Sequence, residues 1–276
     1  MRPFAEGLLL AALLFSTAAS AADGAPALDE NEALRASQAV IGNSVPEHTL
    51  LDAKGRPLSL SSYRGKPLLV SFIYTGCFQV CPTQTRALHE AVKGLDTVFG
   101  AHQFNVVSIG FNQPFDSPTA MRAFAAQQGI DAANWAFLSP PPATVEALTR
   151  DFGFRYAATP AGFDHVLGVT IVDAEGRIQA QVLGNRLTAG QLGEPLRRLL
   201  GNAPLPLEWR VDDLIERVRI LCTVYDPETG TYRYDVKLIL EIFGGLTFFL
   251  SVGVYLLLEL LRQRRQTRLR AHAALS

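Results

Sequence analysis

Short apolar runs alternate with helix-length segments through the middle of the chain. The run from Lys66 to Tyr74 is short, largely apolar and rich in β-branched and aromatic residues, which predicts a buried strand. The same criteria predict strands at 104–110 and 134–139, and hairpins at 48–60 and 166–183. Helices are expected between them, with prolines near their starts or glycines at their ends, at 82–99, 117–128, 143–151 and 189–200.

Strands that alternate with helices, followed by a closing hairpin and a last helix, are typical of an α/β sandwich with a mixed central sheet. A pair of cysteines lies at the first strand-to-helix junction, as in the thioredoxin-like fold. We therefore expect a thioredoxin-like domain over residues 44–201, preceded by a mobile leader at 22–43.

The two ends of the chain carry long apolar runs of different kinds. Residues 1–21 combine Arg2, a short apolar stretch and Ala19-Ser20-Ala21, which predicts a cleaved signal peptide. Residues 238–261 are long and apolar enough for one transmembrane helix. The tail at 262–276 is rich in arginine and has no acid, so the positive-inside rule places it in the cytoplasm and the main domain outside.

Between the main domain and this apolar run, residues 202–236 predict a linker, an amphipathic helix and a hairpin. The formal net charge of −1 gives no reason to expect a nucleic-acid partner. Beyond the predicted signal, Met121 is the only methionine, which excludes a thioether-rich copper site.

Cys77 and Cys81 follow the buried strand directly and precede Pro82, which marks a helix start. Unpaired N–H groups at a helix N-terminus favour thiolates, which attack disulfides and bind soft metals. Positions i and i+4 of a helix share a face, so both sulfurs are expected to point at one spot. A structural disulfide is the alternative interpretation, but it would close a very small loop and stabilise the fold little. Cys222 would remain unpaired.

His165 is the histidine best placed to complete a soft-metal site, at the mouth of the closing hairpin. A lone histidine is more often an ordinary polar residue, so the pattern alone leaves this open. His89 is two helical turns beyond Cys81 and too far away. We expect three others, His48, His102 and His272, to be solvated.

The motif Tyr74-Thr75-Gly76-Cys77-Phe78-Gln79-Val80-Cys81-Pro82, with Asp164-His165 further on, resembles the Sco/SenC family of thioredoxin-like, membrane-tethered copper chaperones. The resemblance implies that Cys77, Cys81 and His165 bind copper, and that the protein helps to assemble the dinuclear copper site of cytochrome c oxidase. Because its predicted membrane anchor follows the domain, the chain resembles a bacterial subgroup of this family with a C-terminal anchor. One departure is Gly110, where the family has an aspartate, whereas Asp116-Ser117-Pro118 resembles the family's Asp-Thr-Pro.

Two functions remain open from the sequence. The first is a copper(I) metallochaperone of a bacterial inner membrane, with its functional domain in the periplasm, an oxidase subunit as the recipient of copper and a thiol reductant outside the cytoplasm. The second is a membrane-tethered thiol-disulfide reductase that uses Cys77 and Cys81 as a redox pair on the cysteines of an oxidase subunit. A peroxiredoxin-like peroxidase fits less well, because such sites place threonine where this chain has Tyr74.

Overall fold

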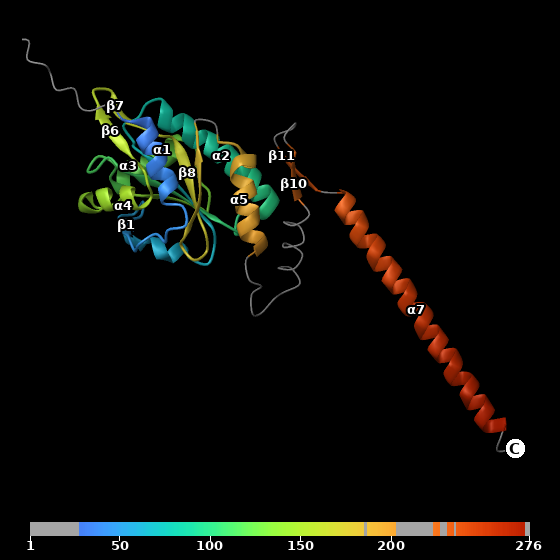
Figure 1. The fold of residues 1–276 in the computed structure, drawn as a ribbon. Coiled ribbons are helices and arrows are strands. Elements are labelled where there is room, and N and C mark those ends of the chain that lie inside the picture. The colour runs from blue at the N-terminus through green and yellow to red at the C-terminus, as the bar shows by residue number, and fades with distance from the viewer. Residues whose placement is uncertain (1–27, 185–186, 203–222, 227–230, 235, 274–276) are drawn as a thin grey trace, which may run out of the picture.

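A five-stranded sheet forms the centre of the molecule (Figure 1). The computed structural model describes residues 28–184, 187–202, 223–226, 231–234 and 236–273. The spatial order of the central strands is β5-β4-β3-β8-β9, with β3 parallel to β4, β4 parallel to β5, and the other neighbours antiparallel. Their bounds are β3 Leu68–Ile73, β4 Asn105–Gly110, β5 Trp135–Leu138, β8 Gly168–Val172 and β9 Ile178–Leu183. The predicted mixed sheet is confirmed.

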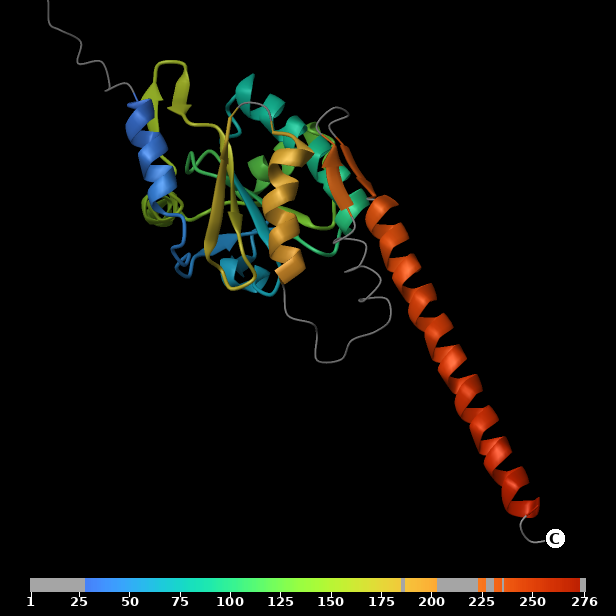
Figure 2. The same ribbon diagram turned by 45° about the vertical axis from the view of Figure 1, so that its right-hand side comes forward.

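Helices cover both faces of this sheet. Helices α2 (Val80–Phe99) and α5 (Ala189–Asn202) pack against each other on one face (Figures 1 and 2). Helix α1 (Glu30–Ala39) and helix α4 (Val145–Asp151), which follows the 3-10 turn η2 (Pro142–Thr144), cover the other. Helix α3 (Pro118–Gln127) packs on β5. The predicted helices are thereby confirmed to within a few residues.

Three smaller hairpins accompany the main sheet. Strands β1 (Thr49–Leu51) and β2 (Pro57–Ser59) form the predicted first hairpin and lead into the 3-10 turn η1 (Leu60–Tyr63). Strands β6 (Tyr156–Thr159) and β7 (Gly162–His165) form a hairpin that the sequence pattern did not predict. Near the C-terminus, β10 (Thr223–Asp226) pairs antiparallel with β11 (Thr231–Tyr234).

The prediction of a mobile leader over 22–43 was wrong for the residues that the structure describes. Residues 30–39 form helix α1, whose N-terminus is capped by the Asp29 carboxylate accepting a hydrogen bond from the Glu32 N–H. Ala33 and Ser37 lie four residues apart on one face and are buried. Small residues on that face let α1 approach the domain closely, a pattern that a search for large apolar residues misses.

His48 was expected to be solvated, and this expectation was wrong. Only 8% of the residue is exposed, and its Nε2 lies 3.0 Å from the Asp151 carboxylate of α4. The pair joins the first hairpin to α4 across a long stretch of sequence. His102 is exposed as expected, and His272 has no described side chain.

Helix α7 (Val236–Ala273) contains the predicted transmembrane span and extends away from the domain (Figure 1). The large apolar side chains described between Leu240 and Leu258 are exposed. No helix in the described part of the chain has both the length and the hydropathy that a bilayer span requires. The predicted signal peptide at 1–21, the predicted amphipathic helix and Cys222 lie outside the described residues.

The close approach of α1 gives a test of its attachment. Gly153 has φ +64, and a Cβ built there would lie 2.5 Å from the Ala36 carbonyl oxygen. We expect Gly153→Ala to destabilise the domain by about 2–4 kcal/mol, because backbone strain adds to the displacement of α1. Gly129→Ala is the matched control, since Gly129 has φ +67 with open space around it. Urea denaturation of both variants measures the difference, and equal losses would show that α1 does not pack as described.

Candidate functional site

The topology brings three loops to one edge of the sheet. Strands β3 and β4 are parallel and in register, with Ile73 opposite Gly110, so the loops that follow them leave the sheet side by side. Strand β8 runs antiparallel to β3, so the segment entering β8 arrives at this same edge. The first loop carries Cys77, the second carries Asp116, and the third carries His165.

Cys77 and Cys81 are both free thiols, and their sulfurs are close. The helix begins at Val80, so Cys77 precedes it and Cys81 lies in its first turn. The Cys77 Sγ accepts a hydrogen bond from the Cys81 N–H at 3.2 Å. The expected proximity of the thiols therefore holds, but it comes from a loop that folds over the helix start and not from two positions on one helix face.

The two thiols have opposite pKa shifts. Burial would raise the pKa of Cys77, but the N–H groups of Cys81 and Gln79 and the Tyr74 hydroxyl stabilise its thiolate and lower the pKa overall. Burial raises the pKa of Cys81 to about 12, and negative charge on Cys77 and Asp116 acts in the same direction. Cys77, which is also the more exposed, is therefore the thiol expected to react first as a nucleophile, and Cys81 is a buried thiol held beside it.

Asp116 holds the cysteine loop in place. Its Oδ1 accepts hydrogen bonds from the Thr75 N–H and the Thr75 hydroxyl, each at 2.7 Å, and its Oδ2 accepts one from the Asn112 N–H at 2.8 Å. The residue is fully buried, and burial raises its pKa although these donors oppose the shift. Gly110 gives the carboxylate its space, since a Cβ there would lie 2.5 Å from the Asp116 Cβ.

His165 ends strand β7, in the hairpin that the sequence pattern did not predict. Its ring is packed among aromatic side chains, with centroid distances of 5.3 Å to Phe154, 5.7 Å to Phe111 and 6.5 Å to Tyr74. Burial lowers the pKa of the ring, despite the Val166 carbonyl and the Asp164 carboxylate, which favour the cation. The ring is therefore neutral at pH 7 and keeps the lone pair that metal coordination requires.

Tyr74 contacts both parts of the site. Its hydroxyl hydrogen-bonds with the Cys77 thiol and accepts a hydrogen bond from the Phe163 N–H of β7, while burial raises the pKa of Tyr74 to about 12. Gly162 leaves room for this hydroxyl, because a Cβ at that position would approach it to 2.5 Å. One side chain thus links the cysteine loop to the hairpin that carries His165.

The described residues contain no group of three histidine, cysteine or acidic side chains close enough together to hold a metal ion. The donor types nevertheless suit a soft metal, since two sulfurs and one neutral imidazole reach the same edge of the sheet. Coordination by all three would require the His165 ring to move toward the thiols from its aromatic surroundings. The structure does not otherwise test the three-ligand assignment, which stays a prediction.

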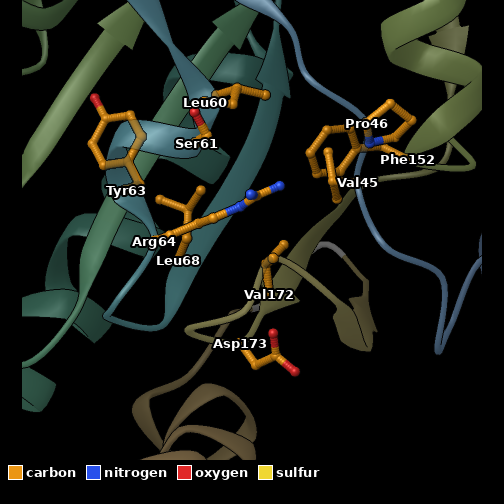
Figure 3. A pocket seen from close by; sticks show the side chains of 11 residues that line it. Val45, Pro46, Leu60, Ser61, Tyr63, Arg64, Leu68, Phe152, Val172 and Asp173 are labelled. Carbon is orange, nitrogen blue, oxygen red and sulfur yellow. The ribbon is translucent and has the colours of Figure 1, made fainter.

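A hollow at the opposite edge of the sheet is a poor candidate for a site (Figure 3). It lies between the start of β3 at Leu68 and the end of β8 at Val172, and has room for only about 30 Å³, roughly one water. Its acid, Asp173, already accepts hydrogen bonds from the backbone N–H groups of Glu175 and Arg177 and from the Gln179 side chain. We therefore assign the chemistry to the cysteine edge.

The unequal pKa shifts predict how the reduced protein reacts with an alkylating reagent. Cys77 should react first, with a pH midpoint below that of an ordinary thiol, while Cys81 stays unmodified near neutral pH. Tyr74→Phe removes a donor to the thiolate, so it should raise the Cys77 midpoint. Mass spectrometry of alkylated peptides across pH 5–10 measures both effects. Equal reactivity of the two cysteines would contradict the assignment of Cys77 as the nucleophile.

The contacts of Asp116 predict the result of removing its charge. In Asp116→Asn one oxygen is replaced by a donor that faces either Thr75 or Asn112, so at least one buried N–H loses its acceptor. We expect a loss of about 1–3 kcal/mol in the free energy of unfolding. Asp131→Asn, at an exposed carboxylate, is the control and should be neutral. An equally neutral Asp116→Asn in urea denaturation would show that this carboxylate does not hold the loop.

Comparisons with known proteins show which family the chain resembles. Residues 37–201 match the SCO1/SenC family model. The chain is 28% identical over 95 residues to a SCO1 protein homolog of Bacillus subtilis, covering 34% of this chain and 48% of that protein. It is 25% identical to the mouse mitochondrial SCO2 homolog, covering 60% of this chain and 65% of that protein. The chain thus spans half to two thirds of these relatives.

A solved structure and a further protein also match this chain. The crystal structure of Arabidopsis thaliana ScoI with copper bound superimposes with a TM-score of 0.50, at 16% identity, over 55% of this chain and 98% of that one, which shows a shared fold. A thiol peroxidase of Staphylococcus saprophyticus is 32% identical over 98 residues, covering 36% of this chain and 53% of that protein. The family model covers more than half of this chain, so the protein belongs to the SCO1/SenC family.

Proposed function

We propose that this protein binds copper(I) as cargo through Cys77, Cys81 and His165 and passes it to the cysteine sulfurs of an acceptor protein. The observation that carries the proposal is the pair of free thiols at the edge of the sheet where the neutral imidazole of His165 also arrives. Thiolate sulfur and imidazole nitrogen are the donors that copper(I) prefers. The copper-bound ScoI with the same fold supports the choice of metal.

The chain's own residues have separate roles in this proposal. Cys77 is the exposed, more acidic thiol, so its sulfur is the one that an incoming ligand of the acceptor reaches first. Cys81 is buried and its thiol binds protons more tightly, so metal binding there must displace a proton. Asp116 keeps the loop in position, and the aromatic side chains around His165 exclude water from one side of the site.

We further propose that the acceptor is the copper-receiving subunit of cytochrome c oxidase, as the family resemblance implies, and that a thiol reductant outside the cytoplasm keeps the cysteines reduced. The apolar run 238–261 of the sequence, only part of which has described side chains, would anchor the protein in a bacterial inner membrane, with the domain in the periplasm. The exposed apolar side chains of α7 from Leu240 to Leu258, followed by an arginine-rich tail, support this placement.

A thiol-disulfide reductase is the second candidate, and the unequal thiols favour it. A thiolate at Cys77 attacks a substrate disulfide and releases one substrate thiolate; the deprotonated Cys81 then attacks the mixed disulfide and releases the second. The protein ends oxidised and the substrate ends as a dithiol. This chemistry uses the same cysteines and has no need of His165.

His165 separates the two candidates. Under anaerobic conditions the reduced full-length protein in detergent should bind one copper(I) ion, and His165→Ala should bind it at least about tenfold more weakly, because the loss of even an outer-shell partner has an effect of this size. Cys77→Ser should abolish stoichiometric binding, and His102→Ala, at an exposed histidine, should bind like the wild type. A competition titration with a chromogenic copper(I) chelator measures all four proteins.

The same variants should be compared in reduction of a model disulfide. If copper is the cargo, His165→Ala loses copper affinity and keeps its rate of disulfide reduction. Disulfide reduction by a wild-type protein that binds no stoichiometric copper would reverse the ranking and leave the reductase as the function.

A further inference from the structure

Large apolar side chains are exposed around the reactive thiol. Phe78, directly after Cys77, is 97% exposed, and Phe115, directly before Asp116, is 72% exposed. Val80 is also exposed. Among the described residues outside helix α7, the only other exposed large apolar side chain is Ile41. Phe78 and Phe115 therefore lie in the loops at the cysteine edge, Val80 begins helix α2 directly after the first of these loops, and folding alone gives no reason for their exposure.

The two loops that carry Phe78 and Phe115 are fixed to each other. They follow the parallel strands β3 and β4, and Asp116 bonds to Thr75 in one loop and to Asn112 in the other. Phe115 and Phe78 are therefore held at the same edge of the sheet and not on loops that move independently. We call Phe78 and Phe115 the aromatic rim of the site.

The aromatic rim carries no charged side chain. Residues 74–80 and 111–115 contain no lysine, arginine, histidine, aspartate or glutamate, and Asp116 is buried. The hairpin that carries His165 adds one exposed carboxylate, Asp164. Anionic lipid headgroups attract basic residues, which these loops lack, so a membrane surface is a poor match. A second copy of the chain would cover Cys77 and block the exchange in which it takes part.

We propose that the aromatic rim is the docking surface for a protein partner that presents its cysteine sulfurs from an uncharged, apolar surface. The inference rests on the proposed function, because a partner that takes copper from Cys77, or exchanges a disulfide with it, must bring a sulfur to its Sγ. Phe78 directly follows Cys77 in the sequence. A partner that reaches the Cys77 sulfur therefore also covers the aromatic rim. Burial of Phe78 and Phe115 then supplies apolar contact energy at the moment of exchange.

Two synthetic peptides serve as probes. Both contain the same Cys-x3-Cys disulfide, one flanked by leucine and valine and the other by serine and glutamate, and dithiothreitol should reduce the two at equal rates. The full-length reduced protein in detergent is mixed with each peptide, and the second-order rate of peptide reduction is measured. In each reaction the protein dithiol is oxidised to a disulfide and the peptide disulfide is reduced to a dithiol.

The wild type should reduce the apolar peptide at least about tenfold faster than the polar one, an advantage equivalent to about 1.4 kcal/mol. The double variant Phe78→Ser, Phe115→Ser should lose this preference and keep its rate with the polar peptide. Ile41→Ser is the matched control, since Ile41 is exposed but belongs to neither loop, and it should behave like the wild type. Unfolding in urea should be unchanged in all three proteins because these side chains are exposed.

Several outcomes would overturn the inference. Equal rates with both peptides in the wild type exclude an apolar docking surface. A Phe78-dependent dimer in analytical ultracentrifugation assigns the rim to a second copy, and protection of Cys77 from a membrane-impermeant alkylating reagent in liposomes assigns it to lipid. Copper stoichiometry is measured separately, so failure of the copper proposal with retained peptide preference is distinguishable from failure of the docking surface.

Discussion

The site depends on the hydrogen bonds of one buried carboxylate. Asp116 accepts two bonds from Thr75 and one from Asn112, so it connects the loops that leave β3 and β4. Both loops lack regular structure, and this connection holds them to each other beyond the ends of the two strands. A charged group pays a desolvation cost in such a place, and three donors offset it. The position of Cys77 thus follows from a residue 39 positions away in the sequence (116 minus 77).

The sequence predicts the elements of the fold well because their signals are local. Strand β3 is fully buried and reads as a largely apolar run, and Ser117 caps α3 where Ser-Pro predicts a helix start. The β6–β7 hairpin has no such signal, since its alanines and threonine are partly buried or exposed and it packs through a few aromatic side chains. Its turn at Pro160-Ala161-Gly162 was the available clue.

The site itself is less predictable, because its contacts are long-range. The cysteine spacing identifies Cys77 and Cys81, and the resemblance to the family identifies His165. Asp116 looks like an ordinary turn and cap residue, and its role is visible only once β3 and β4 are in register. The roles of Tyr74 and Gly162 also depend on tertiary packing, since the Tyr74 hydroxyl occupies the space that a side chain at position 162 would need. The charge state of each thiol follows from these same contacts.

The opposite pKa shifts of the two thiols suit transfer better than storage. A site meant to retain a metal would stabilise both sulfurs as thiolates, whereas burial here opposes deprotonation of Cys81. In the proposed transfer, metal binding at Cys81 would therefore be coupled to the loss of its proton. The same coupling serves disulfide exchange, in which Cys81 must lose its proton to release the substrate. The chain belongs to the SCO1/SenC family and also shares local similarity with a thiol peroxidase, which is consistent with this thiol pair, and His165 with its aromatic surroundings is the part that would distinguish a metal site from a purely redox one.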